Sequence, residues 1–125
     1  MTRHKCLILG ASGLVGQRLQ QRLQHHPLFE IAAVAGSKRT AGRNLSELEW
    51  RLEDGRPELP NLTVLDANSP NLIEDIIQSD IQIAFSALPS DIADSVERRL
   101  VESEIMVFSN ASSYRRTPGV PMIIP

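Results

Sequence analysis

The chain has 125 residues, of which 42% are hydrophobic and 22% are charged. This length is enough for one compact core, and the composition is that of an ordinary folded domain, so disordered, collagen-like and coiled-coil chains are excluded. The net charge of -2 provides no general positive field, so neither nucleic acid nor an anionic membrane is expected as a partner. No run of about eighteen apolar residues occurs, so no membrane span is expected either.

Cys6 is the single cysteine of the sequence. It can form neither an internal disulfide nor a cysteine-based zinc site, so we expect a reducing compartment, the cytoplasm, and no metal site. The basic start of the chain and the apolar run after it resemble a signal peptide. Gly10, Gly13 and Gly16 interrupt that run, and no small-residue cleavage site follows, so a secretory signal is rejected.

Short apolar runs of strand length alternate with helical patterns along the chain. The sequence predicts, in order, a strand over 6–9, a helix over 14–23, strands over 31–35 and 62–65, a helix over 72–77, a strand over 81–85, a helix over 92–100, and strands over 105–108 and 122–124. The strand runs are continuously apolar, which is typical of parallel strands covered on both faces. The fold class expected is α/β, a doubly wound and mostly parallel Rossmann-like sheet of about six strands.

Residues 37–61 have no clear periodicity and are punctuated by Gly42, Gly55, Pro57 and Pro60. We expect a long excursion from the sheet here, with one helical turn around 45–52. Loops of this length are uncommon in compact domains unless they bind something.

The segment GASGLVG at 10–16 follows the first strand and begins the first helix, which is the context that a dinucleotide fingerprint requires. Its spacing is GxxGxxG rather than GxGxxG. Gly10 permits a tight turn, Gly13 lets backbone N–H groups approach a pyrophosphate, and Gly16 lets the helix pack closely against the sheet. A glycine-rich turn without a ligand is the alternative, although three glycines carry an entropic cost that such a turn does not need.

The end of the second predicted strand lacks the acidic residue that would hold a ribose 2′-hydroxyl in an NAD-binding domain. Ser37, Lys38, Arg39 and Thr40 follow instead. Hydroxyls and cations of this kind suit a 2′-phosphate, so the cofactor expected is NADP(H). The alternative is a solvated basic turn.

Six stretches of the sequence, taken together, resemble the N-terminal cofactor domain of the aspartate-β-semialdehyde dehydrogenase family. They are residues 10–17, 26–31, 36–42, 85–90, 108–115 and 120–125, and the segments SALPS and SNAS are similar to the archaeal and fungal branch. The resemblance covers nearly the whole chain. It implies an NADP-binding Rossmann domain over 1–125, and it places the family's catalytic and dimerisation domain outside this chain.

The resemblance implies an enzyme that reduces β-aspartyl phosphate to its semialdehyde with NADPH, in the biosynthesis of lysine, threonine and methionine. A cysteine thiolate would form a thioacyl-enzyme in that reaction. The implied partners are the acyl phosphate or semialdehyde and phosphate, with a homo-oligomer for the full-length form. No catalytic residue is expected within this chain, because Cys6 lies in a central strand where an inert thiol is the rule, so the isolated chain is predicted to be inactive.

The resemblance also carries over site residues by position. The pyrophosphate is expected at Gly10, Ser12, Gly13, Leu14, Val15 and Gly16, the 2′-phosphate at Ser37, Lys38, Arg39 and Thr40, the ribose and nicotinamide at Ser86, Ala87, Leu88 and Pro89, and the substrate phosphate at Asn110 and Arg115. For Arg115, a surface cation in a turn remains the alternative.

Three other functions share features with this sequence. The cofactor domain of an N-acetylglutamyl-phosphate reductase shares the fold and the acyl-phosphate chemistry, but residues 37–42 favour the aspartate enzyme. A short-chain reductase needs a Tyr-x-x-x-Lys pair, and Tyr114 is followed at that spacing by Pro118. A stand-alone NADP-binding module without catalysis stays open.

Overall fold

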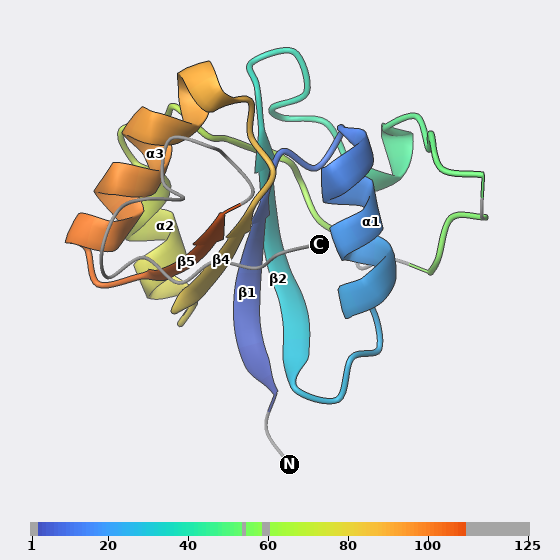
Figure 1. Ribbon diagram of the computed structural model, residues 1–125, viewed down its shortest axis with the longest axis horizontal. Helices are drawn as coiled ribbons and strands as arrows, with labels where there is room; N and C mark the ends of the chain where they lie inside the picture. The colour runs from blue at the N-terminus through green and yellow to red at the C-terminus, as the bar shows by residue number, and fades with distance from the viewer. Residues whose placement is uncertain (1–2, 54, 59–60, 110–125) are drawn as a thin grey trace.

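The computed structural model describes residues 3–53, 55–58 and 61–109. Within these residues, five parallel strands form one sheet with helices on both of its faces (Figure 1). The strands are β1 (His4–Leu9), β2 (Phe29–Gly36), β3 (Leu65–Asp66), β4 (Ile83–Ser86) and β5 (Met106–Ser109), and the helices are α1 (Leu14–Leu23), α2 (Leu72–Gln78) and α3 (Ser90–Glu102). The predicted doubly wound α/β fold is confirmed.

The strand order is β3-β2-β1-β4-β5, so β1 lies at the centre of the sheet. The chain winds outwards from β1 to β3, returns to the other side of β1, and winds outwards again through β4 and β5. The order therefore reverses between β1 and β4. In open parallel sheets, ligands bind in the crevice outside the carboxyl ends of the strands at such a switch point.

Two apolar cores pack the helices onto the sheet. On one face, Ala93, Val96 and Leu100 of α3 and residues of α2 pack against side chains of the strands. On the other face, Leu23 of α1 packs with residues of the 37–61 excursion against β1 and β2. The continuous hydrophobic pattern of the strands arises because both faces are covered. No helix among the described residues is both long enough and apolar enough to cross a membrane.

The elements differ from the prediction mainly at their ends and at the sheet edge. The strand expected over 62–65 is reduced to Leu65–Asp66, and Thr63 instead forms an antiparallel bridge with Asn44. Pairing with the excursion therefore replaces the first half of that strand. The sixth predicted strand, over 122–124, lies outside the described residues.

The 37–61 excursion is held together by specific contacts among its own residues. Its expected helical turn is a short 3₁₀ helix, Leu45–Glu47, which Asn44 caps. The guanidinium of Arg56 lies over the Trp50 ring at 5.7 Å from the ring centroid. The same guanidinium donates hydrogen bonds to the carbonyl oxygens of Ser46 and Leu48. Trp50 is thus an internal anchor of the excursion.

Candidate functional site

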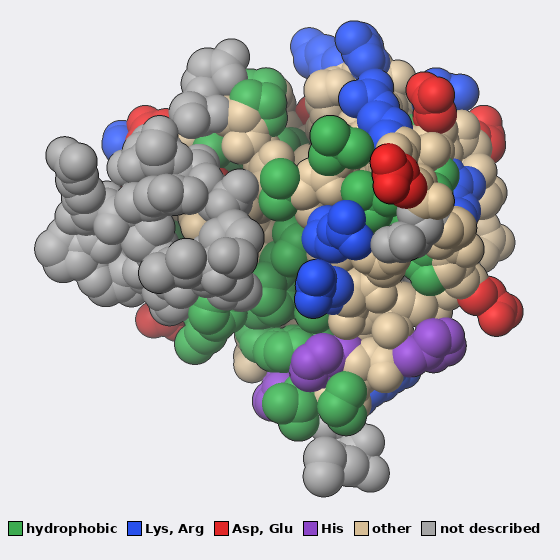
Figure 2. Space-filling model, turned by 45° about the vertical axis from the view of Figure 1, so that its right-hand side comes forward, with side chains coloured by type: hydrophobic (Ala, Val, Ile, Leu, Met, Phe, Trp, Pro, Cys, Tyr) green, Lys and Arg blue, Asp and Glu red, His purple; other side chains and the backbone are tan. Residues whose placement is uncertain are grey.

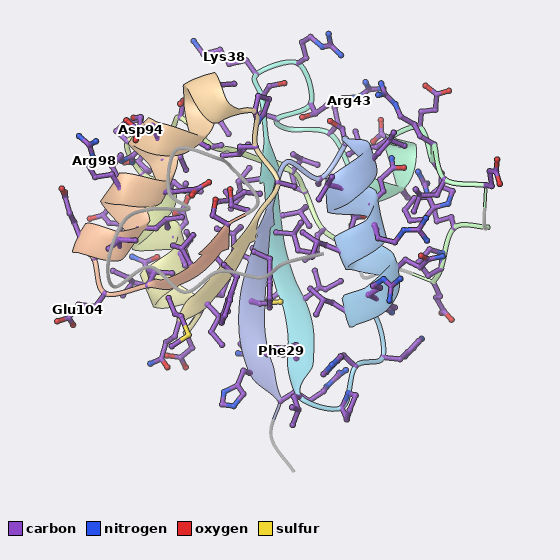
Figure 3. The ribbon with its side chains drawn as sticks, viewed as in Figure 1. Phe29, Lys38, Arg43, Asp94, Arg98 and Glu104 are labelled. Atoms are coloured by element: carbon purple, nitrogen blue, oxygen red, sulfur yellow. The ribbon has the colours of Figure 1, made fainter. Side chains whose placement is uncertain are left out.

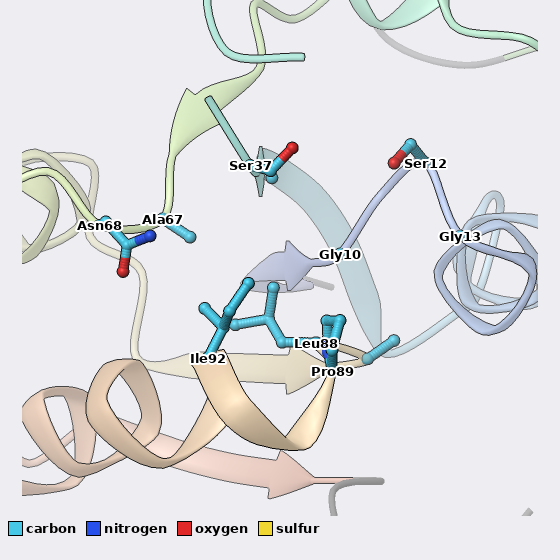
Figure 4. A pocket seen from close by; sticks show the side chains of 11 residues that line it. Gly10, Ser12, Gly13, Ser37, Ala67, Asn68, Leu88, Pro89 and Ile92 are labelled. Atoms are coloured by element: carbon cyan, nitrogen blue, oxygen red, sulfur yellow. The ribbon is translucent and has the colours of Figure 1, made fainter. Parts of the chain in front are cut away.

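A cleft lies at the carboxyl ends of the strands and is lined by residues at or just beyond the ends of β1, β2, β3 and β4 (Figure 4). Its volume is about 200 Å³, which is smaller than the roughly 300–1,000 Å³ typical of small-molecule pockets. A ligand as long as a dinucleotide would therefore extend beyond the cleft. The lining residues are Gly10, Ser12, Gly13, Gly36, Ser37, Ala67, Asn68, Ala87, Leu88, Pro89 and Ile92.

The glycine loop between β1 and α1 is held by close backbone contacts. Gly10 has a φ of +81°, and a Cβ atom on it would lie 2.7 Å from the carbonyl oxygen of Ala87. A Cβ atom on Gly16 would lie 1.9 Å from the carbonyl oxygen of Gly10. Neither position can accept a side chain without moving backbone atoms, so the close packing expected of Gly16 is packing against the loop itself.

Gly13, by contrast, has open space around it. A Cβ atom there would have its nearest neighbour, the Gly10 carbonyl oxygen, at 3.8 Å. Gly13 is also the N-cap of α1, and it supplies no side chain to cap the helix. Because the first N–H groups of a helix have no partners within it, this end of α1 can receive an anion directly on its backbone.

The residues that follow Gly13 lie in the first turn of α1. Leu14 and Val15 are exposed at 55% and 43%, which is unusual for large apolar side chains. Gly16 is buried in the close contact just described. Ser12 and Gly13 line the cleft, whereas Leu14, Val15 and Gly16 do not.

Two buried glutamines of α1 hold the glycine loop in place. Gln20 donates from Nε2 to the Ala11 carbonyl oxygen at 2.7 Å. Gln17 donates to the carbonyl oxygens of Ser12 and Glu49, and its Oε1 accepts from the Arg51 N–H at 2.7 Å. Gln17 thereby joins the loop to the excursion.

The loop after β2 presents its charges to solvent. Ser37, Lys38 and Arg39 are exposed, and Ser37 lines the cleft. Thr40 is buried, and its hydroxyl donates to the Ser37 carbonyl oxygen at 3.2 Å. Lys38 projects from this end of the sheet in Figure 3, and Figure 2 shows Lys and Arg side chains gathered over the same end of the molecule. No acidic side chain of the described residues lines the cleft.

The segment after β4 forms the opposite wall. The Ala87 N–H donates to the Leu9 carbonyl oxygen at 2.9 Å, which fixes this wall against the end of β1. Ala87, Leu88 and Pro89 line the cleft. Ser86, which was expected beside them, is buried and its hydroxyl donates to Glu97 Oε2 at 2.6 Å. Its side chain therefore faces α3 rather than the cleft.

Some lining residues were not anticipated from the sequence. Ala67 and Asn68 come directly after β3, and the Ala67 N–H donates to the Gly36 carbonyl oxygen at 2.9 Å. Ile92 lies in the first turns of α3. The signal that would have found Ala67 and Asn68 is their place at the carboxyl end of a strand beside β2.

The remaining candidate residues bear on catalysis. Asn110 and Arg115, the predicted substrate residues, lie outside the described residues. Cys6 is fully buried as a free thiol, and burial, with a smaller effect of Glu30, raises its pKa to about 12. A thiol of this kind is neither accessible nor ionised near neutral pH, so it is no nucleophile. Among the described residues, no cluster of His, Cys, Asp and Glu could hold a metal ion.

Comparisons with known proteins agree with this geometry. The aspartate-semialdehyde dehydrogenase of Aspergillus fumigatus is 38% identical over 125 residues, covering 98% of this chain and 33% of the relative. That of Methanothermobacter thermautotrophicus is 41% identical over 119 residues, covering 94% of this chain and 33% of the relative. The chain thus spans about a third of the length of these curated relatives. One relative is fungal and the other archaeal, the branch that the sequence motifs favoured.

A solved structure is similar in fold as well as in sequence. The crystal structure of aspartate semialdehyde dehydrogenase with NADP from Candida albicans superimposes with a TM-score of 0.82 at 34% identity, over 99% of this chain and 34% of that chain. The family model described as semialdehyde dehydrogenase, NAD binding domain, matches residues 5–125. The glycine loop, the cleft at the switch point and this match over nearly the whole chain agree, and the chain belongs to the NAD-binding domain family of the semialdehyde dehydrogenases.

Proposed function

We propose that this chain is the NADP(H)-binding domain of an aspartate-semialdehyde dehydrogenase, which reduces β-aspartyl phosphate to the semialdehyde. The observation that carries the proposal is the cleft itself. The glycine loop lines it through Gly10, Ser12 and Gly13, and no acidic side chain of the described residues lines it. The exposed cations Lys38 and Arg39 directly follow Ser37, which lines its β2 side. The relatives named above bear this enzyme's name, and one of them was solved with NADP.

The described residues fit the parts of a dinucleotide. Ser12, Gly13 and the amino end of α1 would hold the pyrophosphate, because the backbone around Gly13 is open and uncapped. Ser37, Lys38 and Arg39 would hold the 2′-phosphate, since a guanidinium forms forked hydrogen bonds with phosphate oxygens. Ala87, Leu88 and Pro89 would line the ribose and nicotinamide side. When bound, NADPH supplies a hydride, and the protein supplies its orientation.

The acyl-transfer step would need a thiolate that this chain does not offer. Cys6 is the only cysteine in the sequence and is buried with a raised pKa. We therefore place the nucleophile outside residues 1–125. The chain spans about a third of its relatives' length, and we place the proton-transfer group and the subunit contacts of a homo-oligomer in the remainder, with Asn110 and Arg115 on the substrate side. A free buried thiol also supports a reducing compartment, the cytoplasm.

The test is titration calorimetry of the purified chain with NADP⁺ and NAD⁺. NADP⁺ should bind more tightly, and Arg39→Ala should weaken NADP⁺ by about tenfold or more while leaving NAD⁺ unchanged, since a charge-assisted hydrogen bond contributes about 1.5–3 kcal/mol. Arg22→Ala, an exposed arginine in the last turn of α1, is the matched control and should change neither affinity. Equal affinities for the two cofactors in the unmodified chain would refute the NADP(H) assignment.

A further inference from the structure

Glu97 is a carboxylic acid at a core position of α3. Its side chain is 0% exposed, as are those of Ala93, Val96 and Leu100, with which it forms one stripe of the helix. The other three pack in the apolar core between α3 and the sheet. An acid at such a position is costly to bury unless it is hydrogen-bonded, so its presence calls for a physical reason.

The partners of Glu97 are the last residues of two neighbouring strands. The Ser86 hydroxyl donates to Glu97 Oε2 at 2.6 Å, and the Ser109 hydroxyl is a second hydrogen-bond partner. Ser86 and Ser109 are paired in the register of β4 and β5, and both are only 1% exposed. One carboxyl group thus holds the carboxyl ends of both strands against α3.

Those strand ends lead to the candidate site. Ser86 is followed directly by Ala87, Leu88 and Pro89, which line the cleft, and the amino end of α3 begins at Ser90. The Ala87 N–H is bonded to the Leu9 carbonyl oxygen on the other side. The position of the cleft wall therefore depends on two anchors, the backbone of β1 and the side chain of Glu97.

Burying the carboxyl group of Glu97 costs free energy that an apolar side chain would not cost. Its second oxygen, Oε1, is buried and has no hydrogen-bond partner among the described residues. Burial raises the pKa of Glu97, the hydrogen bonds from Ser109 and Ser86 lower it, and Asp94 one turn earlier raises it. A leucine or methionine would fill the same space without these costs, which points to a requirement for the hydrogen bonds themselves.

We propose that Glu97 is a positioning residue for the nicotinamide half of the cofactor site, acting through the hydroxyls of Ser86 and Ser109 on the wall formed by Ala87, Leu88 and Pro89. This inference rests on the proposed function, because it assumes that the cleft binds NADP(H). Glu97 does not touch the ligand. It fixes the strand ends, so that the wall is in place before the nicotinamide half arrives.

The experiment compares two ligands on the same protein. Adenosine 2′,5′-bisphosphate contains only the adenosine half and would use the β2 side, whereas NADP⁺ would use both walls. Glu97→Met removes the hydrogen-bond acceptor at similar length, and Glu97→Gln keeps one acceptor oxygen. Ser86→Ala removes one of the two hydroxyl donors, and it serves as the test variant if Glu97→Met does not fold. Glu102→Gln, an exposed acid at the end of α3, is the matched control.

We expect Glu97→Met to weaken NADP⁺ about tenfold relative to the bisphosphate, Ser86→Ala to weaken it several-fold, and Glu97→Gln and Glu102→Gln to stay within about twofold of the unmodified chain. A folded methionine variant with an unchanged ratio of the two affinities would overturn the inference. A glutamine variant as defective as the methionine variant would also overturn it, because the acid and not the anchoring would then matter. If the unmodified chain binds neither ligand, the proposed function itself fails.

Discussion

Two loops at the same edge of the sheet are built in opposite ways. The glycine loop after β1 is determined by backbone contacts and is held by two buried glutamines, whereas the loop after β2 exposes Ser37, Lys38 and Arg39 to solvent. The first loop offers peptide groups, which suit the pyrophosphate that all dinucleotides share. The second offers side chains, which can discriminate one dinucleotide from another. Under the proposed function, the backbone of the first loop would serve the common part of the ligand, and the exposed side chains of the second would serve the variable part.

The strongest test of the rigid loop is a single methyl group at Gly16. Gly16→Ala places a Cβ atom 1.9 Å from the Gly10 carbonyl oxygen, so backbone atoms must move. We expect a loss of about 3 kcal/mol in the free energy of unfolding, measured by urea denaturation, and loss of NADP⁺ binding. Gly13→Ala is the matched control, because its nearest neighbour is at 3.8 Å, and its free energy of unfolding should change by less than about 1 kcal/mol. An alanine variant at Gly16 as stable as the unmodified chain would show that the loop is not rigid.

The next largest effect is expected at Gln20. Gln20→Met keeps the length of the side chain but leaves the buried Ala11 carbonyl oxygen without its 2.7 Å donor. Leaving such a group unsatisfied costs about 1–3 kcal/mol in the free energy of unfolding. Gln21→Met, whose Oε1 accepts from Arg18 at the surface, should change it by less than about 0.5 kcal/mol. Equal effects of the two substitutions would contradict the anchoring role of Gln20.

A smaller effect is expected on the exposed loop. Lys38 is a solvated charge, so Lys38→Ala should weaken NADP⁺ binding by less than about fivefold at low ionic strength and leave NAD⁺ unchanged. Salt should reduce the difference in NADP⁺ affinity between the unmodified chain and Lys38→Ala, because the Debye length falls from about 10 Å at 0.1 M to about 3 Å at 1 M. Calorimetry at both ionic strengths measures it. A loss of the same size for NAD⁺ would mean that Lys38 does not read the 2′-phosphate.

The smallest effect near neutral pH is expected at Cys6, in the strand that leads into the glycine loop. Burial, with a smaller contribution from Glu30, raises the pKa of this thiol from 9.0 to about 12, so the folded chain retains the proton that the unfolded chain releases. The contribution of Cys6 to stability is therefore complete below pH 9 and is lost as the pH rises towards 12. At pH 8, a thiol reagent should label the urea-unfolded chain and leave the folded chain unlabelled. Equally fast labelling of both would contradict the burial of Cys6.

Much of the fold could be predicted because parallel strands covered on both faces require continuous hydrophobic segments in the sequence. The continuous apolar runs and the helical spacing of α1 and α3 follow from two-sided packing. The edge of the sheet was less predictable. β3 is only two residues long, because Thr63 pairs with Asn44 of the excursion, and a contact between residues so far apart in sequence has no local signature.

The lining of the candidate cleft could be predicted where it is formed by backbone, and less so where it depends on buried polar side chains. The glycines, Ser37 and the segment after β4 came from motif and position, whereas Asn68 and Ile92 were not anticipated. Gln17, Gln20 and Glu97 occupy buried stripes of α1 and α3. A polar residue at such a position indicates a buried hydrogen bond. Its partner cannot be predicted, because it is a carbonyl or hydroxyl group that comes near only when the chain folds.

The close packing of Gly16 against the Gly10 carbonyl oxygen affects how the amide protons of α1 should respond to a ligand. A loop held by close backbone contacts loses much of its conformational freedom when the chain folds, so less remains to be lost when a dinucleotide arrives. The amide protons at the amino end of α1 should then exchange with solvent deuterium at nearly the same rate before and after an adenosine fragment that lacks a pyrophosphate binds. Slowing should begin only when a pyrophosphate covers these amides directly, which would make hydrogen exchange at the first turn of α1 a reporter of ligand chemistry rather than of loop ordering.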